Sequence, residues 1–126
     1  MNGFRLSQLA SAVALSLCAG SALAQFSNTI FFGDSLTDSG SFKPALPPGT
    51  GLFTTNPGPV WSEVLAQHFG TAATPADQGG TNYAQGGARV SQLPGVPDSP
   101  PTGTATPIAT QVAQYLAAGG GDRNAL

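Results

Sequence analysis

Charged residues are scarce in this sequence. They make up 8% of its 126 residues, and the net charge at neutral pH is −2, whereas about a quarter of the residues in an ordinary soluble domain are charged. The four lysines and arginines lie far apart in the sequence and form no basic run. Proteins that bind nucleic acid present a basic patch to the phosphate backbone, so we expect no nucleic-acid partner.

Metal-binding and disulfide-forming side chains are also nearly absent. The sequence has one histidine, His68, and one cysteine, Cys18. A structural zinc site takes about four Cys or His ligands, so no metal site is predicted. Cys18 lies in the N-terminal segment described next, and the rest of the chain therefore has no disulfide framework.

The first 24 residues are typical of a secretory signal peptide. Arg5 supplies the positive charge near the N-terminus, an apolar stretch covers residues 9–17, and Ala22-Leu23-Ala24 is a cleavage site of the small-x-small type. The apolar stretch is shorter than the roughly 20 residues that cross a bilayer. We predict that residues 1–24 are removed on export, which leaves a chain of about a hundred residues at the cell surface or outside the cell.

A short apolar run and the polar turn after it form the stretch around which the chain is organised. Residues 29–32 (TIFF) are β-branched or aromatic and predict a buried strand, which Gly33 ends. Asp34 and Ser35 then stand at the carboxyl end of that strand, where open α/β sheets bind their ligands. Ser35 is therefore a candidate nucleophile, and it needs a base to accept its proton.

A structural interpretation of the same turn stays open. Ser35 and Asp38 have the spacing of a helix-capping pair, in which the serine accepts hydrogen bonds from unpaired backbone N–H groups.

Two helices are predicted after this turn. The first covers 59–69, with Pro59 at its first position, Gly70 just past its end, and a core-facing apolar side made of Trp61, Val64, Leu65 and Phe69. The second has Thr106 as its N-cap, Pro107 at its first position, an apolar stripe made of Ile108, Val112, Tyr115 and Leu116, and a stop at Gly119–Gly121.

The segments between these elements are rich in proline and glycine. Residues 41–57 and 92–107 are predicted to be loops, the second one extended on the surface. Phe42, Leu52 and Phe53 in the first loop either line a substrate cleft or pack on the core. His68 is either a base for Ser35 or a helix-end residue favoured there by the helix dipole.

The order of elements indicates an α/β fold. A second strand is predicted just before Gly86 and Gly87. Two strands and two helices leave the faces and edges of a parallel sheet bare, and such sheets are covered on both faces. We therefore expect this chain to be part of a longer protein.

Two motifs then carry a family resemblance. Residues 32–40 (FGDSLTDSG) resemble block I of the GDSL (SGNH) family of lipases and esterases, and the Asn-x-Ala-x-x-Gly pattern at 82–87 resembles block II. The resemblance implies a three-layer α/β/α, flavodoxin-like domain with a parallel sheet. It also implies that Ser35 is the nucleophile and that the N–H groups of Ser35 and Gly87 form an oxyanion hole, with Gly86 as the adjacent alternative.

The same resemblance implies supporting roles for two polar residues near these motifs. Asp34 precedes the nucleophile, and Asn82 anchors the second motif by side-chain hydrogen bonds.

Two further blocks of that family are missing. The sequence has no Gly-x-Asn-Asp, and no Asp-x-x-His, because Leu65 stands three residues before His68. The resemblance therefore implies that 25–126 are the N-terminal portion of a hydrolase domain, truncated before these blocks and inactive alone. The substrate would be a small ester or a lipid, and the reaction would need no cofactor.

The form of block I most resembles secreted autotransporter esterases. Membrane anchoring would then depend on a β-barrel beyond Leu126. The alternatives are a lipid acyltransferase or phospholipase of the same family, and a non-catalytic, truncated surface protein.

Overall fold

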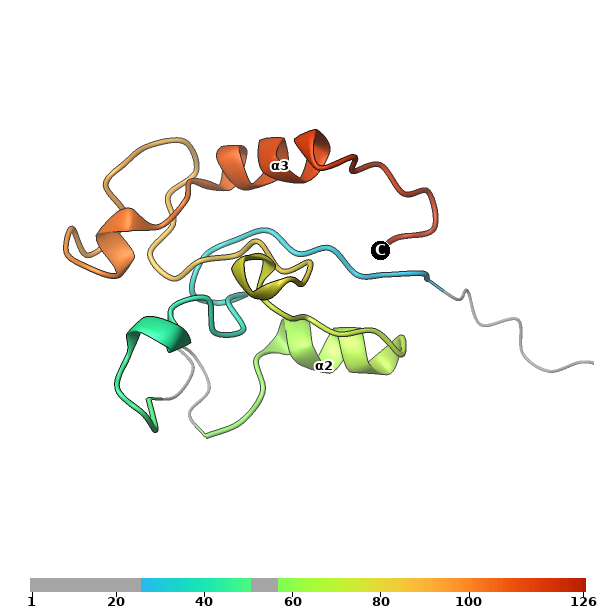
Figure 1. Ribbon diagram of the computed structural model, residues 1–126, viewed down its shortest axis with the longest axis horizontal. Coiled ribbons are helices and arrows are strands. Elements are labelled where there is room, and N and C mark those ends of the chain that lie inside the picture. Colours follow the sequence, from blue (N-terminus) through green and yellow to red (C-terminus); the bar gives the residue numbers. More distant parts are fainter. Residues whose placement is uncertain (1–25, 51–56) are drawn as a thin grey trace, which may run out of the picture.

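The computed structural model describes residues 26–50 and 57–126 (Figure 1). The predicted signal peptide and the cleft candidates Leu52 and Phe53 lie outside these residues. The helices are α2 (Trp61–His68) and α3 (Ile108–Ala117), and the 3₁₀ turns are η1 (Lys43–Ala45), η2 (Ala76–Gln78) and η3 (Thr102–Thr104). Both predicted helices are therefore confirmed. Among the described residues, no helix is long and apolar enough to cross a membrane.

The extended segment 26–33 runs between the two helices, with α3 on one side and α2 on the other (Figure 1). Side chains alternate between the faces of an extended chain, and two adjacent phenylalanines show this. Phe31 is buried against α2, where it packs with Ala66 and meets the ring of Trp61 edge-on at 5.6 Å. Phe32 points the other way and meets Tyr115 of α3 at 5.7 Å.

Segment 26–33 is hydrogen-bonded to parallel neighbours on both sides. On one side the N–H of Phe31 donates to the carbonyl of Thr81 (3.2 Å), and the N–H of Tyr83 donates to the carbonyl of Phe31 (2.8 Å). On the other side the N–H of Ile30 donates to the carbonyl of Leu126 (2.8 Å). These pairs are isolated bridges, and no sheet of named strands is defined among the described residues, so the α/β fold with a parallel sheet stays a prediction.

Helix α2 starts two residues later and ends one residue earlier than predicted, with Phe69 as its C-cap. Its N-cap is Val60, so Pro59 lies before the helix, and the Glu63 carboxylate accepts the N–H of Val60 (2.9 Å). At the other end Gly70 adopts a left-handed φ of 72°. The N–H of Gly70 donates to Gln67 and that of Thr71 to Ala66, which is a Schellman motif.

The predicted core-facing side of α2 is wrong in part. Trp61 and Val64 are each 52% exposed, whereas the buried residues of the helix are Ser62 and Ala66. The Ser62 hydroxyl donates to the carbonyl of Thr37 (2.8 Å). This tertiary hydrogen bond and the small alanine one turn later set the rotation of the helix, and apolar spacing alone does not reveal it.

The predicted stripe of α3 needs the same correction. Val112 and Leu116 are exposed, and the buried side chain of this helix is Gln111. The N-cap is Pro107, and Thr106 makes no side-chain capping bond. The predicted stop is confirmed, because Gly119 has a φ of 89° and Gly120 donates to Tyr115 in a second Schellman motif.

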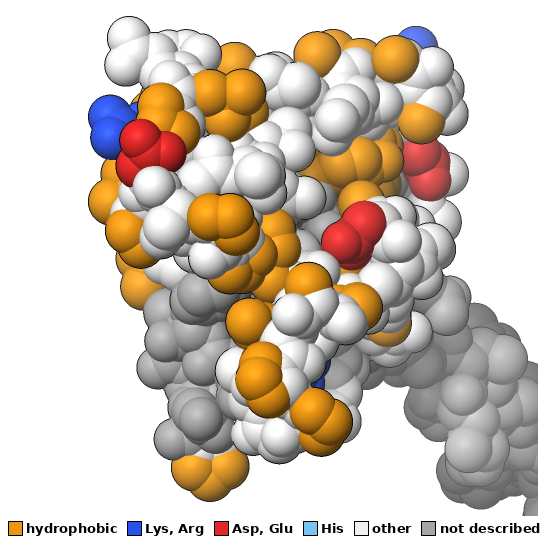
Figure 2. All heavy atoms as spheres, turned by 60° about the vertical axis from the view of Figure 1, so that its left-hand side comes forward, with side chains coloured by type: hydrophobic (Ala, Val, Ile, Leu, Met, Phe, Trp, Pro, Cys, Tyr) orange, Lys and Arg blue, Asp and Glu red, His pale blue; other side chains and the backbone are white. Residues whose placement is uncertain are grey.

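The predicted surface loop 92–107 is partly folded back on the molecule. It contains η3, and Gly95 and Thr102 are buried. The N–H of Gly95 donates to the carbonyl of Gly103 (3.0 Å), and the N–H of Val96 donates to the carbonyl of Gly87 (2.8 Å). Figure 2 shows this side of the molecule, where hydrophobic side chains are dispersed among polar and backbone atoms and charged side chains are few.

Candidate active site

The turn after segment 26–33 is built around Asp34. Its carbonyl accepts the N–H groups of Thr37 (3.1 Å) and Asp38 (3.0 Å), and its carboxylate accepts the N–H of Leu36 (3.0 Å). Gly33 enters the turn with a φ of 154°, and a Cβ there would lie 2.9 Å from the hydroxyl of Thr37. Glycine is therefore needed for the chain to bend sharply before Ser35.

Ser35 is half-buried on this turn, and its polar groups take no part in the hydrogen bonds that hold the turn. Within residues 26–50 and 57–126, neither its hydroxyl nor its backbone N–H makes a hydrogen bond. Its neighbours Asp34, Leu36 and Thr37 are all hydrogen-bonded. The Ser35 hydroxyl is thus left to meet a ligand or a base, as a nucleophile requires.

Asp38 does not form the alternative capping pair with Ser35. Its fully buried carboxylate accepts the N–H groups of Gly40 (2.8 Å) and Ser41 (2.7 Å) through one oxygen, and that of Gly86 (2.7 Å) through the other. Asp38 therefore joins the first motif to the second, a role that the sequence interpretation missed.

Gly86 and Gly87, the two candidate oxyanion donors, differ in what their N–H groups do. The N–H of Gly86 is bound to Asp38, whereas that of Gly87 has no acceptor among the described residues. Gly87 has a φ of 87°, and a Cβ there would lie 2.5 Å from the carbonyl of Val96. Of these two glycines, Gly87 is thus the one whose N–H has no acceptor among the described residues, and a side chain at its position would clash with the backbone of Val96.

Asn82, the first residue of the second motif, is hydrogen-bonded to the turn that contains the first. Its buried amide donates to the carbonyl of Thr37 (2.8 Å) and to the hydroxyl of Ser39 (2.9 Å), and its oxygen accepts the N–H of Ala84 (3.1 Å). The Ser41 hydroxyl adds a bond to the carbonyl of Ala84 (2.8 Å). The structure therefore brings the turn at 34–41 and the segment at 82–87 together.

Gln111 of α3 holds the residue at which segment 26–33 ends. Its side-chain amide accepts the N–H of Gly33 (2.9 Å) and donates to the carbonyls of Gly33 (2.9 Å) and Thr106 (2.8 Å). The sequence interpretation missed this residue. The available signal was a polar side chain inside the apolar stripe, three residues after Ile108 and four before Tyr115.

His68 lies far from Ser35 in the structure. It is exposed at the end of α2 and its ring contacts Phe69 at 4.9 Å, while Phe69 contacts Phe26 at 5.0 Å. Phe26 begins the extended segment, whereas Ser35 follows its other end. At about 3.3 Å per residue, such a segment separates the two ends by roughly 20 Å, so His68 is a helix-end residue.

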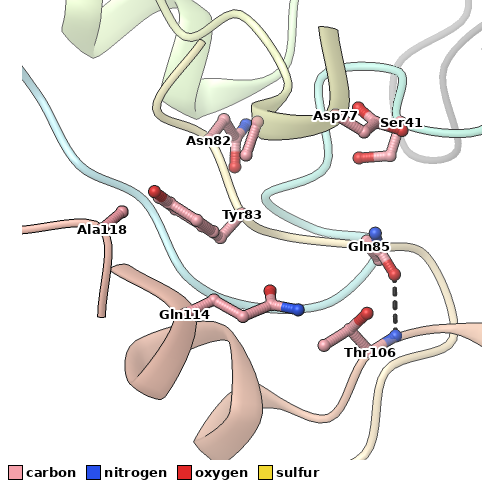
Figure 3. A pocket seen from close by; sticks show the side chains of 9 residues that line it. Ser41, Asp77, Asn82, Tyr83, Gln85, Thr106, Gln114 and Ala118 are labelled. Atoms are coloured by element: carbon pink, nitrogen blue, oxygen red, sulfur yellow. Dashed lines mark hydrogen bonds between the residues drawn. The ribbon is translucent and has the colours of Figure 1, made fainter. Parts of the chain in front are cut away.

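An open pocket of about 370 Å³ lies beside the two motifs (Figure 3). Asp77, Tyr83, Gln85 and Gln114 are among its lining residues, and Ser35, Gly86 and Gly87 are not. Burial, and then the nearby charge of Asp38, raise the pKa of Asp77. The pocket offers hydrogen-bonding groups to a polar ligand, but it is not where the candidate nucleophile lies.

Metal-ligating side chains do not cluster in the part of the chain that the structure describes, where no group of three or more could hold an ion. Comparisons with protein-family models, with curated proteins and with solved structures found no match to this chain. The interpretation of the site therefore rests on the two motifs and on the geometry around Ser35 and Gly87.

Proposed function

We propose that this chain carries the nucleophile and two oxyanion donors of a secreted serine hydrolase that acts on carboxylic esters, of the GDSL type that its motifs resemble. The observation that carries this proposal is a contrast in hydrogen bonding. The Ser35 hydroxyl and the N–H groups of Ser35 and Gly87 are free among the described residues, whereas the backbone around them is held by a network of hydrogen bonds.

Each free group has a role in the proposed reaction. The Ser35 oxygen attacks the acyl carbon as a base takes its proton, and the carbonyl oxygen becomes negative. The two N–H groups stabilise that oxygen, and one such donor is typically worth about 10²–10³-fold in rate. The alcohol leaves, and water then releases the acid from the acyl-enzyme.

The sequence lacks the motif that carries the base in the family it resembles. It has no Asp-x-x-His, and His68 lies at the other end of segment 26–33 from Ser35. We propose that the base comes from a segment outside this sequence. Removing the base of a serine hydrolase costs several orders of magnitude in rate, so these 126 residues alone should be nearly inactive.

A diffusible base tests this proposal. Hydrolysis of p-nitrophenyl butyrate is measured with and without excess imidazole, for the unmodified chain and for Ser35→Ala. A second variant, Ser91→Ala, is the control, because Ser91 is exposed in a loop. We expect no Ser35-dependent turnover in plain buffer. With imidazole, the unmodified chain and Ser91→Ala should exceed Ser35→Ala by about tenfold or more.

Two results would contradict the proposal. Equal rates for all three chains in imidazole would exclude Ser35 as the nucleophile. Ser35-dependent turnover without imidazole would show that a base lies within this sequence.

A further inference from the structure

Asp38 is an acceptor for a set of backbone donors. Its carboxylate is fully buried, and a buried charge is tolerated only where hydrogen bonds compensate it. Two of its donors, Gly40 and Ser41, lie in its own turn, and the third, Gly86, lies 48 residues away. Hydrogen bonds to a charged acceptor are about twice as strong as neutral ones.

The bond to Gly86 fixes the backbone next to the proposed oxyanion donor. Two consecutive glycines leave the peptide between them free to rotate, because neither has a Cβ. Here the N–H of Gly86 is held by Asp38, and the carbonyl of Gly87 is held by the N–H of Val96 (2.8 Å). The peptide that carries the Gly87 N–H therefore lies between two anchored groups.

We propose that Asp38 is a positioning residue for the oxyanion hole, which aims the Gly87 N–H by binding the N–H of Gly86. The proposal rests on the proposed function and goes further, because it assigns the neighbouring Gly86 to the support rather than to the oxyanion hole. Asp38 itself touches no reacting atom.

Butylboronic acid is a suitable probe because it needs no catalytic base. The Ser35 oxygen bonds to boron, the serine proton goes to solvent, and the boron becomes a tetrahedral anion whose oxygen takes the oxyanion position. Binding is followed by ¹¹B NMR. Ser35→Ala should abolish this signal.

Asp38→Asn replaces one acceptor oxygen by an NH₂ group, so at least one of the three backbone donors loses its acceptor. We expect this variant to bind the boronic acid about 10–100-fold more weakly. Asp98→Asn, a change at an exposed loop carboxylate, is the control and should bind as the unmodified chain does.

The outcomes separate the two proposals. No boronate at Ser35 of the unmodified chain overturns the proposed function and the role of Asp38 with it. Binding by the unmodified chain that is unchanged in Asp38→Asn overturns only the role of Asp38.

A measurement on the unmodified chain covers the case in which Asp38→Asn does not fold. The amide proton of Gly86 should exchange slowly with solvent and that of Gly87 fast, and the boronic acid should slow only Gly87. Equal exchange at both glycines before ligand is added would overturn the role of Asp38.

Discussion

At the scale of single residues, Gln111 shows how one side-chain amide can hold the backbone of a distant residue. Its amide makes two hydrogen bonds to Gly33, one to the N–H and one from its own NH₂ to the carbonyl, as a backbone peptide would. The carbonyl of Gly33 also accepts the N–H of Gln85 (3.2 Å). Gln111 and the segment at 82–87 therefore hold the same residue just before the Ser35 turn.

Gln111→Met should destabilise the protein clearly. Methionine is of similar size but cannot hydrogen-bond, so the N–H of Gly33 and the carbonyl of Thr106 lose this partner. Each buried group left unpaired costs about 1–3 kcal/mol, and urea unfolding should show a loss of at least about 2 kcal/mol. Gln114→Met, an exposed change on the same helix, should stay within about 0.5 kcal/mol. Equal losses in both variants would contradict the role of Gln111.

At the scale of elements, both helices end in the same motif. Gly70 after α2 and Gly119 after α3 have left-handed φ angles of 72° and 89°. Both glycines come just after a segment with apolar residues at helical spacing, which is why the helix ends could be predicted.

Gly70→Ala should cost about 1 kcal/mol, measured by thermal or urea unfolding. A Cβ at Gly70 meets no atom within 4 Å, so the cost comes from the left-handed backbone alone. Gln67→Ala, an exposed position inside the same helix, is the control and should be nearly neutral. Equal stability of Gly70→Ala and the unmodified chain would show that the turn after α2 relaxes freely.

The apolar faces of these helices were less predictable than their ends. Spacing identifies which side chains are apolar, but the rotation of each helix is set by a tertiary hydrogen bond. Ser62 binds Thr37 from α2, and Gln111 binds Gly33 from α3. The partners lie 25 and 78 residues away, so no local pattern could reveal them.

At the scale of the whole molecule, residues 122–126 are hydrogen-bonded to residues 27–30, near the start of the described part of the chain. The N–H of Leu126 donates to the carbonyl of Asn28 (3.0 Å), and the Ser27 hydroxyl donates to the Asp122 carboxylate (2.5 Å). The bond from Ser27, and then the backbone N–H of Asn124, lower the pKa of Asp122 from its ordinary value of 3.8.

Ser27→Ala should therefore destabilise the protein in a pH-dependent way. Because the folded-state pKa of Asp122 lies below its unfolded value, the stabilisation is present above about pH 4. It is lost as the pH falls through the lowered pKa. Melting temperatures of the variant and the unmodified chain should differ at pH 7 and converge at low pH. A difference that persists unchanged at low pH would contradict this account of Asp122.

The candidate residues could be named from the sequence, whereas the contacts that hold them in place could not. The resemblance of the two motifs to the GDSL family pointed to Ser35, Gly87 and Asn82, and the catalytic roles of Ser35 and Gly87 stay a prediction. Asp38 was identified only by its contacts, because its acceptor role depends on a glycine that is distant in sequence.

The most direct test of the account is to find which atom becomes acylated. The unmodified chain is treated with p-nitrophenyl butyrate and imidazole, quenched in acid, digested and mapped by mass spectrometry. We predict a butyryl group on Ser35 that is absent from Ser35→Ala. Butyrylation spread over exposed serines such as Ser91, with none on Ser35, would contradict it.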